Sequence, residues 1–134
     1  GHGDEMVPVV SCTTVAGIPI THFLSKEKID AIVSRTAMGG GEIVKLMGTS
    51  AYFAPALAIS EMVESVIKDK RKVLPCSAYL EGEYGIKDLY FGVPVILGAN
   101  GVEKIIELEL SNEEKEKIKK SEAAVRSVVN ILKF

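Results

Sequence analysis

Apolar residues recur at helical spacing in several stretches of this chain, and the first such stretch follows Ser25. Ser25 is a good N-cap residue, and the positions after it place apolar side chains on one face of a helix. These apolar residues are Ile29, Ile32, Val33, Ile43, Val44 and Met47. The spacing predicts either one long amphipathic helix or two helices joined near residues 39–41, which are all glycine.

A second helical pattern runs from Tyr52 to Lys68. Pro55 is compatible with a helix only in its first turn, so the helix is expected to begin near Tyr52. Its first half, residues 54–59, is apolar on every face and must be covered all round. Contact with another subunit and burial in the core of this chain explain that pattern equally well.

The pattern of apolar residues becomes typical of β-strands further along the chain. Residues 73–80, 89–97 and 102–110 are predicted to be antiparallel strands, with Asn100-Gly101 as the type I′ turn of a hairpin. The motif from Ser111 to Glu114 is a capping box that opens a last amphipathic helix. The order helix, helix, three strands, helix predicts an α+β fold, in one domain that spans residues 1–134.

Composition indicates an ordinary soluble globular domain. The chain has 134 residues, of which 47% are hydrophobic and 25% charged, and its formal net charge of −2 argues against electrostatic recruitment by nucleic acid or an acidic membrane. No membrane span or signal peptide is recognised. Cys12 and Cys76 show no metal-binding spacing, and we expect both to be buried free thiols in a reducing compartment, which favours the cytoplasm.

The sequence offers few groups for chemistry, and His2 is the main one. It stands between Gly1 and Gly3, where backbone and ligand can approach closely, and its ordinary pKa of about 6.5 suits proton transfer near neutrality. A Gly-His start is also typical of a cloning remnant. His22 is expected to be a surface residue, and no spacing indicates a metal site. The triple glycine lacks the context of a phosphate-binding loop.

Motifs along almost the whole chain resemble those of the lactate/malate dehydrogenase family, and most closely its bacterial malate-type members. They include Gly1-His2-Gly3-Asp4, residues 15–19 (VAGIP), 50–55 (SAYFAP), 80–85 (LEGEYG) and 98–103 (GANGVE). The resemblance implies the α+β substrate-binding, C-terminal half of that fold, with helices packed on antiparallel strands. A Rossmann half, which binds most of the NAD cofactor, is then expected upstream and is not contained in these residues.

The resemblance also implies roles for particular residues. His2 would be the general acid/base in the reversible NAD-dependent oxidation of (S)-malate to oxaloacetate, a reaction of the tricarboxylic acid cycle. Ser50 and Ala51 would contact the substrate, and Pro55 would lie beside the nicotinamide ring. The helix from Tyr52 to Lys68 would form the contact of a homo-oligomer, either a dimer or a tetramer.

Two other functions stay open at this point. The first is a lactate dehydrogenase or another 2-hydroxy-acid dehydrogenase of the same family. The second is a non-catalytic fragment or interaction domain. The aspartate that orients the family's histidine and the arginines that hold the substrate lie upstream of Gly1, so these 134 residues alone are expected to be inactive.

Overall fold

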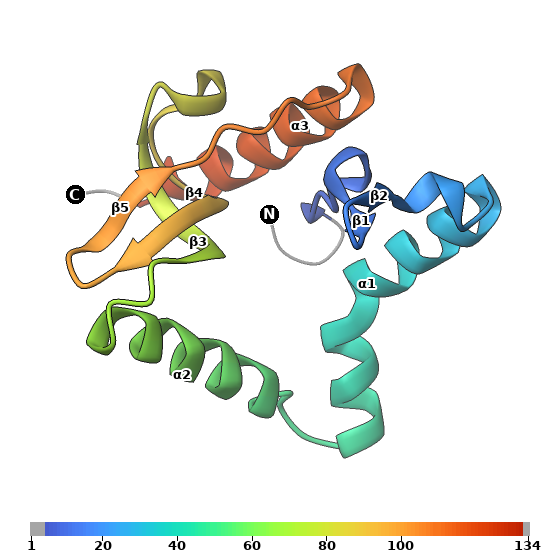
Figure 1. The fold of residues 1–134 in the computed structure, drawn as a ribbon, viewed down its shortest axis with the longest axis horizontal. Coiled ribbons are helices and arrows are strands. Elements are labelled where there is room, and N and C mark those ends of the chain that lie inside the picture. The colour runs from blue at the N-terminus through green and yellow to red at the C-terminus, as the bar shows by residue number, and fades with distance from the viewer. Residues whose placement is uncertain (1–4, 133–134) are drawn as a thin grey trace. The chain divides into compact units, whose positions relative to one another are not determined.

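The computed structural model describes residues 5–132, which fall into two compact units (Figure 1). One unit contains the chain up to Thr49 together with the chain from Leu108 onward, and the other spans Ser50–Glu107. The main elements follow in the order α1, α2, a three-stranded antiparallel sheet β3-β4-β5, and α3. This order confirms the predicted α+β class, whereas the single domain over residues 1–134 stays a prediction.

The first unit is built around helices α1 (Lys26–Met47) and α3 (Asn112–Val129). Helix α1 has Ser25 as its N-cap and ends at Gly48, which has the left-handed φ of 70° that glycine tolerates best. It runs without interruption through residues 39–41, so the alternative of two helices is excluded. Helix α3 opens with the expected capping box between Ser111 and Glu114.

A small hairpin near the N-terminus was not expected from the sequence. Strands β1 (Thr14–Val15) and β2 (Ile18–Pro19) pair around Ala16 and Gly17, whose φ values of 51° and 82° are both positive, as a type I′ turn requires. Short 3-10 turns flank it at Val10–Cys12 and Ile20–His22.

Cys12 and Cys76 are both free, but only Cys76 is buried. The expectation of two buried thiols was therefore wrong for Cys12, which lies exposed on the 3-10 turn Val10–Cys12.

The second unit carries the sheet formed by β3 (Lys72–Glu81), β4 (Lys87–Gly98) and β5 (Gly101–Ile105). Alternate side chains along β3 and β4 point to one face and are buried: Cys76, Ala78, Leu80, Leu89, Phe91, Val93, Val95 and Leu97. The third strand is shorter than the predicted 102–110. Its last bond to β4 runs from the amide of Ile106 to the carbonyl of Pro94, which has no N–H to continue the ladder.

The hairpin between β4 and β5 is confirmed, but its turn type is not. Gly98 pairs with Gly101, and Gly101 has a φ of 83° while Asn100 does not have a positive φ. A type I′ turn requires positive φ at both central residues. The prediction of that turn type was wrong: the two residues between the paired glycines are Ala99 and Asn100, neither has a positive φ, and the left-handed position is Gly101.

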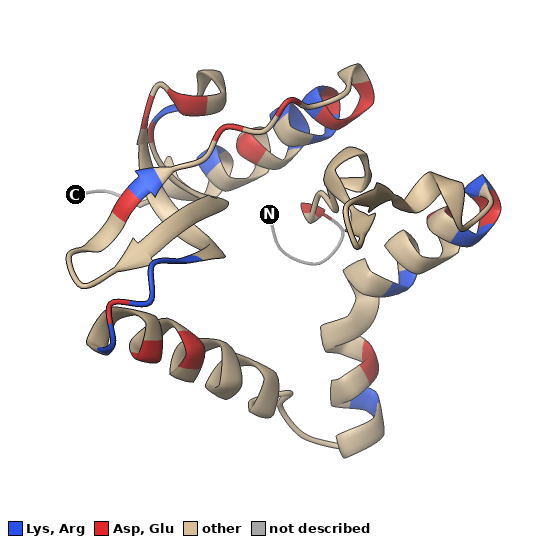
Figure 2. Ribbon diagram, in the orientation of Figure 1, with Lys and Arg blue, Asp and Glu red and all other residues tan. Residues whose placement is uncertain are grey.

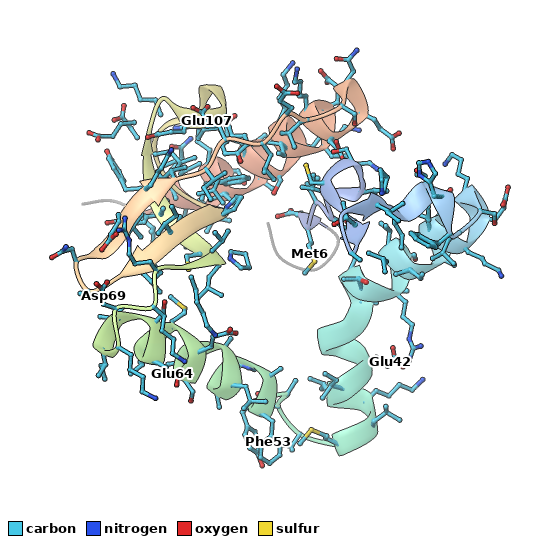
Figure 3. All side chains as sticks on the ribbon, in the orientation of Figure 1. Met6, Glu42, Phe53, Glu64, Asp69 and Glu107 are labelled. Carbon is cyan, nitrogen blue, oxygen red and sulfur yellow. The ribbon has the colours of Figure 1, made fainter. Side chains whose placement is uncertain are left out.

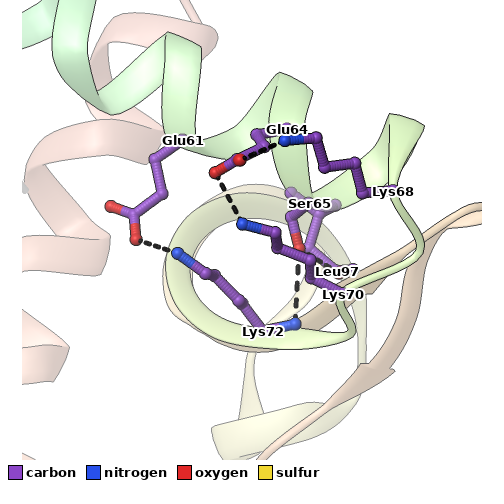
Figure 4. A network of polar contacts seen from close by, with 7 residues as sticks. All are labelled: Glu61, Glu64, Ser65, Lys68, Lys70, Lys72 and Leu97. Atoms are coloured by element: carbon purple, nitrogen blue, oxygen red, sulfur yellow. Dashed lines mark hydrogen bonds and ion pairs between the residues drawn. The ribbon is translucent and has the colours of Figure 1, made fainter.

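Helix α2 (Phe53–Ile67) belongs to the same unit and packs on β4. Tyr52 is its N-cap and Lys68 its C-cap, in agreement with the predicted bounds. The buried hydroxyl of Ser65 donates a hydrogen bond of 2.7 Å to the carbonyl of Leu97 and accepts one of 3.3 Å from the amide of Lys72 (Figure 4). These bonds hold the end of the helix against the sheet.

Candidate active site

His2, the candidate acid/base, lies outside the described residues. The described chain begins at Glu5, and residues 5–8 line one side of a cleft of about 390 Å³ in the first unit. The other sides are formed by α1 and α3, with Val33, Ser34, Ala37, Lys117, Lys120 and Ser121. Residues 5–8 are therefore seated between two helices.

Ser11 fixes this N-terminal segment to α3 through Glu114. Its amide donates a hydrogen bond of 3.0 Å to Glu114 Oε1, and its hydroxyl donates one of 2.8 Å to Oε2. The amide of Ser111 donates a third bond, of 2.8 Å, to Oε2. Sequence reasoning identified Glu114 only as part of the capping box and missed Ser11, because 103 residues separate the two.

Glu114 is a buried carboxylate that stays ionised. Only 6% of the residue is exposed. Burial by itself raises the pKa of Glu114, but the hydrogen bonds from Ser11 and Ser111 outweigh it and bring the pKa to about 2. Its place in the first turn of α3 also favours the negative charge, because the N-terminus of a helix carries partial positive charge.

Ser50, Ala51 and Pro55 lie close together in the second unit, around the start of α2. Ser50 is exposed and Ala51 is half-buried, and both precede the helix. Pro55 is the third helical residue, where a backbone N–H would have no partner within the helix. The structure thus brings these three predicted residues together, and it does not place His2 with them because His2 is not described.

The first half of α2 is apolar and uncharged, in contrast to its second half (Figure 2). Phe53, Leu57 and Ile59 are exposed by 60%, 73% and 60%. Figure 3 shows Phe53 at the start of the helix and Glu64 further along it. A surface of this kind makes apolar contacts and offers no side chain that titrates near neutrality.

Ion pairs gather toward the end of α2. Glu64 lies 2.8 Å from the ammonium groups of both Lys68 and Lys70, and Glu61 lies 2.8 Å from that of Lys72 (Figure 4). The hydrogen bonds and charges of Lys68 and Lys70 lower the pKa of Glu64 to about 2. These ion pairs are exposed. They lie at the same end of α2 as Ser65, which bonds to the sheet.

Within residues 5–132, no cluster of three or more His, Cys, Asp or Glu side chains could hold a metal ion. In the same part of the chain, no helix has the length and apolar character needed to cross a membrane.

A family model and curated relatives identify the chain's family. The model of the lactate/malate dehydrogenase, alpha/beta C-terminal domain matches residues 1–133. A malate dehydrogenase of Roseiflexus sp. (strain RS-1) is 60% identical over 134 residues, which is 99% of this chain and 43% of the relative. A malate dehydrogenase of Bacillus cytotoxicus is 59% identical over 133 residues, or 98% of this chain and 43% of the relative.

Solved structures give the same result. A malate dehydrogenase of Salinibacter ruber superposes with a TM-score of 0.93 at 52% identity, over 97% of this chain and 43% of that one. A lactate dehydrogenase of Cryptosporidium parvum superposes with a TM-score of 0.94 at 42% identity, over 99% and 46%. The chain spans less than half the length of these relatives. It belongs to the lactate/malate dehydrogenase family and corresponds to the C-terminal domain of these enzymes.

Proposed function

We propose that this chain is the substrate-binding half of an NAD-dependent malate dehydrogenase, which oxidises (S)-malate reversibly to oxaloacetate in the tricarboxylic acid cycle. The observation that carries the proposal is 60% identity to a malate dehydrogenase over the whole chain. The half-buried Ala51 and its neighbour Ser50 also fit the malate-type pattern of the SAYFAP motif.

In this proposal His2 transfers the proton. During malate oxidation, the neutral imidazole accepts the proton of the substrate hydroxyl as the hydride leaves the adjoining carbon. In the reverse direction, protonated His2 hydrogen-bonds the carbonyl oxygen of oxaloacetate and gives its proton to it. Histidine suits both directions because its ordinary pKa lies close to neutral pH. Residues upstream of Gly1 would orient His2 and hold the substrate carboxylates.

NAD, when bound, accepts the hydride in malate oxidation. The start of α2 fits the nicotinamide part of this cofactor, because Pro55 is exposed there in an apolar, uncharged surface. The chain contains no G-x-G-x-x-G sequence for the phosphates. Its residues would therefore contact the ring, and most of the binding would come from the upstream half.

A comparison of substrates tests the proposal. In the full-length enzyme, we expect kcat/KM for malate to exceed that for lactate by at least about 100-fold, the order of discrimination that a single pocket contact supplies. Lactate dehydrogenase is the second candidate, since one of the superposed structures is a lactate dehydrogenase with a TM-score of 0.94. A preference for lactate would favour it. Turnover of neither substrate would favour a non-catalytic domain.

The exposed apolar side chains of α2 support a homo-oligomer that forms through this helix. Leu57 and Ile67 are 73% and 77% exposed, which leaves a large apolar area in water unless a second copy covers it. We further propose that the residues 1–134 act as one domain within the full enzyme. The free state of Cys12 and Cys76 supports a reducing compartment, and so the cytoplasm.

A further inference from the structure

The first unit buries very little of its own apolar surface. Among the described residues of this unit, Ile29 is the one hydrophobic residue that is buried, whereas all the other buried hydrophobic residues belong to the second unit. The residues that α3 buries are both polar, Glu114 and Ser121. Helices of a folded domain usually bury an apolar stripe against another element. The first unit is therefore short of a core, and further polypeptide is needed to complete it.

Ser121 marks a place where this core is incomplete. Only 1% of the residue is exposed, and its hydroxyl has no hydrogen-bond partner among the described residues. Other helical hydroxyls of the chain each donate to a carbonyl of their own helix, namely those of Thr36, Ser60 and Ser127. Ser121 makes no such bond, so its hydroxyl is left for a group outside α3. Because buried polar side chains are almost always paired, this hydroxyl needs a partner.

Ser121 lines the cleft of about 390 Å³ between residues 5–8, α1 and α3. Apolar side chains form much of the wall of this cleft: Met6 is 40% exposed, and Val33 and Ala37 are half-buried. One unpaired hydroxyl is thus set in an apolar surface. This combination suits a segment of polypeptide, because a segment offers apolar side chains together with backbone carbonyl groups that accept hydrogen bonds.

Water or a small anion fits this cleft less well. A single water takes up about 30 Å³, far less than the cleft holds, and it would leave the apolar walls uncovered. An anion would meet little net charge there. Lys117 is already paired with Glu113 at 2.7 Å. The other charged residues of the wall, Glu5 and Lys120, have opposite signs.

The relatives of this chain supply the missing polypeptide. The chain spans 43% of the malate dehydrogenase of Roseiflexus sp. and matches a C-terminal domain, so more than half of such an enzyme precedes it. We propose that a segment of this upstream half occupies the cleft, with an apolar side chain against Val33 and Ala37 and a backbone carbonyl that accepts a hydrogen bond from the Ser121 hydroxyl. Ser121 is then the polar anchor between the two halves. The inference rests on the proposed function only in that this chain is one half of a longer enzyme.

The first test is Ser121→Ala in the full-length enzyme. The matched control is Ser127→Ala in the same helix, whose exposed hydroxyl bonds only to the carbonyl of Ala124, at 2.7 Å. An upstream carbonyl that loses the Ser121 hydroxyl stays buried without a donor, so we expect the equilibrium constant for unfolding in urea to rise by about tenfold or more. Ser127→Ala should stay within about twofold of wild type at equal protein concentration. If no group meets the Ser121 hydroxyl, alanine removes an unpaired buried donor and the constant should stay the same or fall.

A crystal structure of the wild-type full-length enzyme gives the answer even if Ser121→Ala fails to fold. We expect an upstream residue in the cleft, with its carbonyl oxygen about 2.5–3.0 Å from Ser121 Oγ. A cleft that holds only water, a small-molecule additive or residues 50–107 would overturn the inference, as would a Ser121→Ala enzyme as stable as Ser127→Ala. Neither readout uses a substrate. A full-length enzyme that prefers lactate, or turns over neither substrate, would therefore contradict the proposed function and leave this inference standing.

Discussion

The hydroxyl of Ser65 in α2 donates a 2.7 Å hydrogen bond to the carbonyl of Leu97 near the end of β4. Ser65 is completely buried, and its oxygen also accepts a bond from the amide of Lys72 at the start of β3. One side chain thus joins the helix to two strands of the sheet. This contact helps to hold α2, and with it Ala51 and Pro55, against the sheet of the second unit.

Replacement of Ser65 with alanine is therefore expected to destabilise the enzyme. Ser65→Ala leaves the Leu97 carbonyl and the Lys72 amide short of a partner, which should lower the free energy of unfolding by about 1–3 kcal/mol. Urea denaturation measures this change in the free energy of unfolding. The control is Ser60→Ala in the same helix, whose exposed hydroxyl bonds only locally to Ala56, at 2.9 Å. It should stay within about 0.5 kcal/mol of wild type. Equal losses for both variants would contradict the role of Ser65.

The β4–β5 turn makes a second prediction. Because Gly101 has a φ of 83° and Asn100 does not have a positive φ, Gly101→Ala should cost about 1 kcal/mol and Asn100→Ala less than about 0.5 kcal/mol. A Cβ at Gly101 meets nothing within 4 Å, so the cost is purely conformational. Urea denaturation of both variants checks this. A larger loss of stability for Asn100→Ala than for Gly101→Ala would contradict this account and favour a type I′ turn.

Glu114 predicts how stability depends on pH. Its folded pKa of about 2 lies below the ordinary value of about 4.3, so its contribution to stability is present above the ordinary pKa and is lost as pH falls toward 2. The urea midpoint of wild type should fall between about pH 5 and pH 2. Glu114→Gln should flatten that part of the curve, and Ser11→Ala should give an intermediate slope because the amides of residue 11 and Ser111 still donate to the carboxylate. An unchanged slope in Glu114→Gln would show that the pH dependence of the urea midpoint does not come from this carboxylate.

The apolar start of α2 predicts an effect on assembly. Leu57→Glu places a charge on a side chain that is 73% exposed in the single chain, and a charge buried in a subunit contact is costly without a partner. The variant is expected to have the mass of a smaller assembly by light scattering. Val102→Glu, which changes an exposed apolar residue of the β4–β5 hairpin, serves as the control. An unchanged mass for Leu57→Glu would place the subunit contact elsewhere.

Local patterns were enough to predict most elements. Ser25 and the Ser111–Glu114 box marked two helix starts. The box acts through local hydrogen bonds, whereas Ser25 takes the N-cap position without a side-chain cap bond. The β1–β2 hairpin was not predicted because Ala16 takes a positive φ that alanine rarely adopts, so Ala16-Gly17 is not one of the dipeptides that favour a type I′ turn. The third strand was predicted too long because alternation continues after Ile105, whereas the pairing partner supplies no N–H at Pro94.

The candidate site was less predictable from pattern alone. His2, Ser50, Ala51 and Pro55 were recognised through family resemblance, since a histidine between glycines also fits a cloning remnant. The link from Ser11 to Glu114 could not be foreseen, because it joins residues 103 positions apart and neither residue type demands the other. Long-range polar contacts of this kind depend on tertiary structure.

The turnover of His2→Asn tests the account most directly. Asparagine retains a polar side chain of similar reach but cannot exchange a proton near neutral pH. We expect kcat for malate oxidation by the full-length enzyme to fall by about 100-fold or more, the usual contribution of a general acid/base, with unchanged NADH binding. A kcat within a few-fold of wild type, with NADH still bound normally, would contradict the assignment of His2 as the group that transfers the proton.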